Sequence, residues 1–173
     1  MDTFWEILKI TIPAVIVLIT TVYVLKIILK KENENRRLQI ILQNQKMITP
    51  IRLQAYERII LFLERISPNS VIMRLQTPNM TVGQLHKEML VLIRSEFEHN
   101  LSQQLYISID AWEQVRNAKE KTIQLINTAM EGLDVNDNAI KLSQAIFEKL
   151  IESDKSPLQI AINYLKEEIK VLY

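Results

Sequence analysis

The sequence predicts an all-α protein in which an N-terminal transmembrane helix continues as a stalk into a cytoplasmic antiparallel helical bundle. Two observations carry this prediction. A run without any charged residue extends from Ile10 to Leu25 and is followed by a basic segment. Beyond it, apolar residues recur at three- and four-residue spacing between helix-start signals and prolines. The predicted divisions are 1–29 for the tail and transmembrane helix, 30–49 for a basic juxtamembrane stalk, and 50–173 for the bundle.

The predicted transmembrane helix is built on the run ITIPAVIVLITTVYVL and lengthened by apolar residues on both sides. Together they approach the roughly 20 residues that a spanning helix needs. Amphipathic rings and long basic side chains at its two ends favour the membrane interface. The expected interface residues are Trp5, Tyr23, Lys26, Lys30, Lys31, Arg36 and Arg37. A cleaved signal peptide and a buried helix of a soluble domain are the alternatives. The first would need a basic start and a small-residue cleavage site, which this sequence does not show.

The distribution of charged residues predicts the orientation of the chain in the membrane and the classes of partner that it binds. The basic residues that follow the apolar run favour an N-terminus outside and a C-terminal domain in the cytoplasm. The chain has 21 Lys and Arg against 20 Asp and Glu, and its basic excess lies in the first fifty residues. The slightly acidic remainder argues against a nucleic-acid partner. A lipid bilayer is the expected partner of the anchor. A sensor of anionic lipid built on Lys30, Lys31, Arg36 and Arg37 is a further hypothesis, and its alternative is that these charges only set the topology.

Proline and glycine mark the expected helices of the bundle. Thr49 and Pro50 read as an N-cap and a first-turn proline, so a helix is expected to begin there and to end near Ile66. Thr81 and Gln84 have the spacing of a capping box. The other expected helices are a short one through Leu75, one from the capping box to about Tyr106, one from near Ser108 to Gly132, one over 139–151 and one after Ser156. The expected inward residues include Ile51, Ala55, Ile59, Phe62, Leu63 and Ile66, then Leu85, Met89, Leu92, Ile93, Phe97 and Leu101, then Trp112, Val115, Leu125 and Ile126, and last Ile140, Leu142, Ile146, Phe147, Leu150 and Ile151.

Two segments of the predicted bundle resemble a known family. They are 50–66 (PIRLQAYERIILFLERI) and 96–108 (EFEHNLSQQLYIS), behind the apolar N-terminal run. In this respect the chain resembles an uncharacterised family of small single-span bacterial membrane proteins, and the resemblance covers most of the sequence. It implies a helical domain of unknown function anchored in the bacterial inner membrane. It brings no catalytic residues with it.

The strongest candidate for a chemical site is the pair Glu96 and His99. Their Glu-x-x-His spacing places a carboxylate and an imidazole on one helical face, but bundle di-iron sites use two such pairs and two further glutamates. The chain has only two histidines, and His86 lies about 220° around the helix from His99. The alternative is that Glu96 and His99 bond to neighbouring helices or to water. With no cysteine and only two glycines, thiolate chemistry and a phosphate loop are excluded.

We therefore expect no enzyme and no cofactor, but an interaction or scaffold protein that docks a protein partner at the cytoplasmic face of the membrane. Tyr106, which follows Gln103 and Gln104, and Trp112, which lies beside Glu113 and Arg116, are the candidate contact residues. The alternatives are a helix-end surface at Tyr106 and an ordinary i,i+3 ion pair on a solvated face beside Trp112. The alternative function is a metal-dependent helical-bundle enzyme centred on Glu96 and His99. Homo-oligomerisation is left open, because the apolar stripe of the stalk covers too few heptads to predict a coiled coil.

Overall fold

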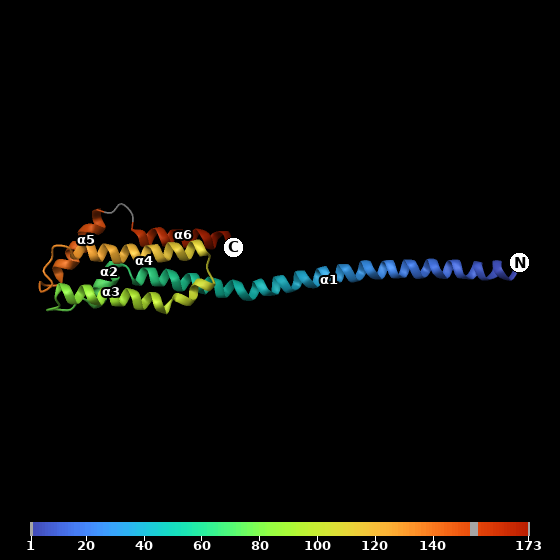
Figure 1. The fold of residues 1–173 in the computed structure, drawn as a ribbon, viewed down its shortest axis with the longest axis horizontal. Coiled ribbons are helices and arrows are strands. Elements are labelled where there is room, and N and C mark those ends of the chain that lie inside the picture. The colour runs from blue at the N-terminus through green and yellow to red at the C-terminus, as the bar shows by residue number, and fades with distance from the viewer. Residues whose placement is uncertain (1, 153–155, 173) are drawn as a thin grey trace. The chain divides into compact units, whose positions relative to one another are not determined.

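The computed structural model describes the backbone of residues 2–152 and 156–172, and the side chains of residues 15–152 and 156–170. In these ranges all regular structure is helical, apart from one isolated bridge between Thr81 and Asn138. This confirms the predicted all-α class. The elements, which Figure 1 shows in chain order, are α1 (Asp2–Arg65), α2 (Pro68–Leu75), α3 (Val82–His99), the 3-10 helix η1 (Leu101–Leu105), α4 (Ile109–Met130), α5 (Ile140–Glu152) and α6 (Pro157–Leu172).

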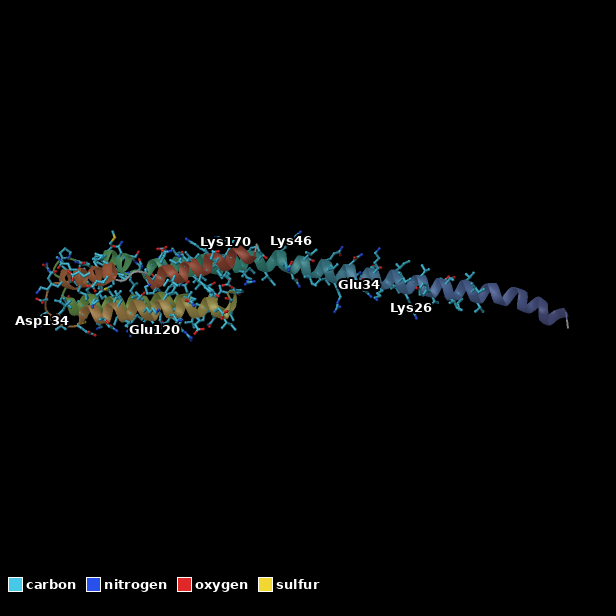
Figure 2. All side chains as sticks on the ribbon, turned by 90° about the horizontal axis from the view of Figure 1, so that it is seen from above. Lys26, Glu34, Lys46, Glu120, Asp134 and Lys170 are labelled. Carbon is cyan, nitrogen blue, oxygen red and sulfur yellow. The ribbon has the colours of Figure 1, made fainter. Side chains whose placement is uncertain are left out.

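The chain divides into two compact units, residues 1–49 and 50–173. The first unit is a single stretch of α1. All of its described side chains from Val15 to Ile48 are exposed, and Figure 2 labels Lys26, Glu34 and Lys46 among them. Within the described part of this unit, the helix therefore has no packed face. Its regular structure depends on its own backbone hydrogen bonds.

No helix in the described part of the chain is long and apolar enough to cross a membrane. A spanning helix needs about 20 predominantly apolar residues. The described side chains begin at Val15, and the charges of Lys26, Lys30, Lys31 and Glu32 soon follow. The predicted single-span location in a bacterial inner membrane, with the C-terminal domain in the cytoplasm, is therefore wrong. The transmembrane helix expected within 1–29 has no support.

The predicted helix start at Thr49 and Pro50 is also wrong, because α1 continues through both residues. A proline inside a helix costs roughly 3 kcal/mol, since it lacks the N–H of one i→i−4 hydrogen bond and its ring crowds the preceding turn. The bond that is lost is the one to the carbonyl of Lys46. Local sequence signals marked a helix start here, but the neighbouring turns on both sides keep the helix continuous.

Residues 50–173 form a helical bundle around a shared apolar core. Within it α4 packs against α3, α5 and α6, and α2 packs against α3 (Figure 1). Burial of each large apolar side chain contributes roughly 1.5–3 kcal/mol. The largest fully buried side chains are those of Tyr56, Ile59, Phe62, Leu63, Ile66, Leu85, Met89, Ile93, Ile126, Leu142, Ile146 and Leu165.

The predicted capping box of α3 is confirmed, and α4 begins next to Ser108 as expected. The Gln84 N–H donates to the Thr81 hydroxyl at 3.3 Å, and the Thr81 N–H donates to the Gln84 side-chain carbonyl at 3.0 Å. The Ala111 N–H donates to the Ser108 hydroxyl at 3.0 Å. Just after α4, Gly132 has a φ of 85°, the left-handed conformation that ends many helices.

The end of α3 differs from the prediction, because the helix stops at His99 instead of near Tyr106. The Asn100 side-chain amide donates to the Glu96 carbonyl at 2.8 Å, and its backbone N–H bonds the Phe97 carbonyl at 3.0 Å. A short polar side chain that takes a backbone carbonyl in this way favours the end of a helix. The chain then continues as η1, and Leu101, which was expected to face inward, is exposed.

Most residues of the predicted inward faces are buried or partly buried, but five of them are exposed. Ile59 and Phe62 in α1 and Leu142 and Ile146 in α5 are buried as expected. The exceptions are residues expected inward that are exposed, namely Ile51, Leu101, Ile140, Phe147 and Ile151. Ile140 and Ile151 lie in the first and last turns of α5, where a helix has fewer neighbouring elements to cover it, whereas Phe147 lies in the middle of that helix.

Candidate functional site

A groove of about 510 Å³ lies between α1 and α3 in the 50–173 unit. Its walls come from residues that recur at three- and four-residue spacing on each helix, which places them on one face. We call it the α1–α3 groove. It is lined by Arg58, Leu61, Phe62 and Arg65 of α1, by Leu92, Ser95, Glu96 and His99 of α3, and by Asn100.

Glu96 is held in this groove by two arginines from other helices. Its Oε2 lies 3.4 Å from Nη1 of Arg65 in α1, and its Oε1 lies 3.1 Å from Nη2 of Arg74 in α2. The Glu96 side chain is only 13% exposed, whereas those of Arg65 and Arg74 are 53% and 40% exposed. A carboxylate that has lost most of its water needs such partners. Each of its oxygens accepts from one guanidinium, so Glu96 also orients both arginines.

His99 lies on the same face of α3 and also lines the groove, as the Glu-x-x-His spacing predicted. Its Nδ1 is 2.8 Å from the backbone carbonyl of Ser95. Because a carbonyl only accepts, Nδ1 carries the hydrogen and Nε2 is left for another partner. Among the described residues, no three or more His, Cys, Asp or Glu side chains are placed to hold a metal ion. The structure thus surrounds Glu96 with cations rather than with further metal ligands.

Arg58 is the cation of the groove that has no internal counter-charge. In the described ranges its guanidinium makes no hydrogen bond and no ion pair. It lies seven residues before Arg65 on α1, so both arginines project along one side of the groove. Sequence reasoning did not single out Arg58, Arg65 or Arg74. Their seven-residue spacing in α1 is a weak signal without the partner helix.

Aromatic rings form the wall behind the groove. The Phe97 ring stacks on Trp112 of α4 with centroids 5.4 Å apart, and it contacts the tilted ring of Phe62 at 5.9 Å. The Nζ atom of Lys119 lies 4.2 Å from the Phe97 centroid. Trp112, a candidate contact residue from the sequence, is therefore half-buried and engaged inside the bundle. These contacts hold α1, α3 and α4 together next to the groove.

Four large side chains project from the segment between α3 and α4. Leu101, Leu105, Tyr106 and Ile109 are 42%, 77%, 40% and 87% exposed, and we call them the η1 patch. The backbone beneath them is fixed, because the Arg52 side chain donates to the Tyr106 carbonyl at 3.1 Å and successive N–H groups close 3-10 turns. Sequence reasoning named Tyr106 but missed Leu105 and Ile109. The available signal was four leucines and isoleucines within nine residues at a helix junction, at positions 101, 105, 107 and 109.

A buried polar pair lies between α1 and α6. Tyr56 is 1% exposed, and within the described residues neither its hydroxyl nor Oε2 of Glu168 has a hydrogen-bond partner. Burial, and then the nearby Glu168 carboxylate, raise the pKa of Tyr56 to about 12, although Arg52 opposes the shift. The phenol is therefore protonated over the whole neutral range. It offers a hydrogen-bond donor but no catalytic base.

The residues predicted for a membrane interface lie in the first unit of the chain. Tyr23, Lys26, Lys30, Lys31, Arg36 and Arg37 are all exposed and follow one another along α1. Arg36 pairs with Glu32 at 2.9 Å, one turn earlier on the same helix. The side chain of Trp5 lies outside the described residues. Such exposed pairs contribute little to stability.

Comparison with known proteins gives one match. A family model described as "Family of unknown function (DUF7935)" matches residues 2–172. No curated protein and no solved structure matches the chain. The expected resemblance to an uncharacterised family is thus confirmed over nearly the whole chain, whereas the match says nothing of membranes or bacteria. No relative supplies a ligand or an activity.

Proposed function

Since the chain belongs to the family of unknown function DUF7935, its role has to be inferred from its own surface, and we propose that it is a non-catalytic helical interaction protein that docks a protein partner. The observation that carries this proposal is the η1 patch, in which Leu101, Leu105, Tyr106 and Ile109 project from a fixed backbone. Clustered apolar side chains of this size mark interaction surfaces more often than solvated loops.

The energetics of the patch favour a protein partner. Covering Leu105 and Ile109, which are 77% and 87% exposed, would contribute roughly 1.5–3 kcal/mol each. Tyr106 adds an aromatic ring with a polar end, a residue type enriched among binding hot spots. Because the hydrogen bonds of η1 and the contact from Arg52 already hold the backbone, docking would lose little conformational entropy.

The alternative, a metal-dependent enzyme centred on Glu96 and His99, is not favoured by any observation. Glu96 would have to give up its ion pairs with Arg65 and Arg74 to bind a metal. Two guanidiniums next to the same carboxylate would also repel a divalent cation. The surroundings of Glu96 therefore support an ion-pair network rather than a metal centre.

The test is affinity purification of the tagged full chain from its native cells after cross-linking, with mass spectrometry of the recovered proteins. The variant is Leu105→Ser with Ile109→Ser, and the matched control is Met73→Ser with Ile151→Ser. All four residues are highly exposed, but the control pair lies outside the patch. Circular dichroism should show that both double variants fold as the wild type does.

We expect a stoichiometric partner with the wild type and the control, and a loss of about tenfold or more with the patch variant, because apolar anchors dominate such interfaces. Recovery of the same proteins with all three chains would overturn the proposal. So would recovery of the wild-type chain alone after cross-linking.

A further inference from the structure

The α1–α3 groove carries a surplus of positive charge. Arg58, Arg65 and Arg74 contribute three guanidiniums, and the carboxylate of Glu96 balances one of them. Among these four side chains, two positive charges therefore remain uncompensated at the groove. A concave surface with such a surplus attracts anions, and its field is strongest where the walls exclude water.

The guanidiniums of the groove also have hydrogen-bond donors that Glu96 does not use. Each has five N–H donors in a planar fork, and Glu96 takes one hydrogen bond from Arg65 and one from Arg74. Within the part of the chain that the structure describes, most of their donors, and all of those on Arg58, are therefore left for a ligand. Since Glu96 holds Arg65 and Arg74 in place, binding a second anion costs less side-chain entropy than binding to free arginines.

Apolar side chains accompany these charges. Leu61 is 54% exposed beside the arginines of α1, and Phe62 and Leu92 complete the apolar part of the lining. Asn100, which lines the groove, directly precedes Leu101 of the η1 patch in the chain. A small free anion would contact only the charged side chains of the groove. A peptide with acidic and apolar side chains would contact both the charged and the apolar lining of the groove.

We propose that the α1–α3 groove binds an acidic segment of the partner protein, with a carboxylate on Arg58 and Arg65 and an apolar side chain against Leu61 and Leu92. This inference rests on the proposed function, because it describes the chemistry of the partner that docks there. Glu96 acts as a positioning residue for the two arginines that it holds.

The experiment measures the binding of a short fluorescein-labelled peptide, rich in glutamate and containing two leucines, by fluorescence anisotropy at low salt. The full chain is compared with Arg58→Ala and with the matched control Arg94→Ala. Both arginines are exposed and lack a partner in the described ranges, but Arg94 lies outside the groove. The two variants have the same net charge, so any difference between them reports the site.

We expect saturable binding that Arg58→Ala weakens by about tenfold, the usual effect of losing a charge-assisted hydrogen bond. Arg94→Ala should weaken it by less than about twofold, because charges outside the groove are screened. Absence of binding to the wild type, or equal losses in both variants, would overturn the inference. Displacement of the peptide by sodium phosphate, but not by sodium chloride of equal ionic strength, would overturn it in favour of a phosphate site.

The same assay separates this inference from the proposed function. The short peptide should bind the Leu105→Ser, Ile109→Ser variant as well as it binds the wild type, because its carboxylates use the groove alone. If the peptide bound in an Arg58-dependent way but no partner were recovered from cells, the proposed function would be refuted. The inference that the groove binds acidic peptides would remain. If a partner were recovered whose binding depends on Leu105 and Ile109, but the peptide did not bind, the groove inference would be refuted and the proposed function would remain.

Discussion

The aromatic contacts behind the groove give the sharpest prediction for stability. Phe97 stacks on Trp112, contacts Phe62 and lies under the ammonium of Lys119. Replacing Phe97 with leucine keeps most of the apolar volume but removes the ring on which all three contacts depend. The substitution therefore measures the ring interactions rather than the loss of a large side chain.

The magnitude follows from these contacts. Each aromatic pair contributes about 0.5–1.5 kcal/mol beyond its buried area. The Lys119 contact contributes about 0.5–2 kcal/mol, toward the upper part of that range because its side chain is only 13% exposed. Contacts that share one ring are not additive, so we expect Phe97→Leu to lower the free energy of unfolding by about 2 kcal/mol. For a domain of this size, that loss corresponds to a fall of about 8 °C in Tm.

The assay is urea and thermal unfolding of the full chain, followed by circular dichroism. Phe147→Leu in α5 is the matched control, because Phe147 is 38% exposed and makes no ring contact in the described part of the chain. We expect the control to lose less than about 0.5 kcal/mol. If Phe97→Leu were no more destabilising than Phe147→Leu, the reasoning from ring geometry would be refuted. A double-mutant cycle with Lys119→Met should isolate a coupling of about 1 kcal/mol.

Two further predictions concern Tyr56 and Gly132. Because the folded state raises the pKa of Tyr56 from 10.0 to about 12, its contribution to stability is complete below pH 10 and is lost as the pH rises toward 12. Over this pH range the free energy of unfolding of the wild type, measured with urea, should thus fall by roughly 2–3 kcal/mol more than that of Tyr56→Phe. Phenolate absorbance of the native protein that is complete near pH 10 would contradict this. Gly132→Ala should cost about 1 kcal/mol, because φ is +85° although nothing lies within 4 Å of the added Cβ. Equal Tm values for that variant and the wild type would show that the left-handed conformation is not needed.

The helices of the bundle were predictable because their signals are local. The capping box of Thr81 and Gln84, the N-cap at Ser108 and the left-handed Gly132 each act within four residues of the chain. Local signals also caused the two errors in α1. Pro50 resembles a helix start in sequence but lies inside a continuous helix, and the apolar run before Lys26 resembles a spanning helix without the required length in the described residues.

The groove was not predictable, because its chemistry depends on tertiary contacts. Sequence spacing shows that Glu96 and His99 share a face of one helix, but it does not show which residues of other helices lie beside them. The partners of Glu96 are 31 and 22 residues away, in Arg65 and Arg74. A carboxylate beside an imidazole suggests a metal ligand until those arginines are placed. After that, the same carboxylate is the counter-charge of a basic groove.

The η1 patch arises from the early end of α3. Phe97, Leu101 and Leu105 are spaced by four residues, so a helix that continued to Tyr106 would place all three on its inward face. Asn100 ends α3 after His99, and the tighter turns of η1 rotate the residues that follow away from the helical register. Phe97 is partly buried and packs against the core, whereas Leu101 and Leu105 are exposed. The apolar spacing that predicts a buried helix thus produces a projecting surface, which is the surface that we propose docks a partner.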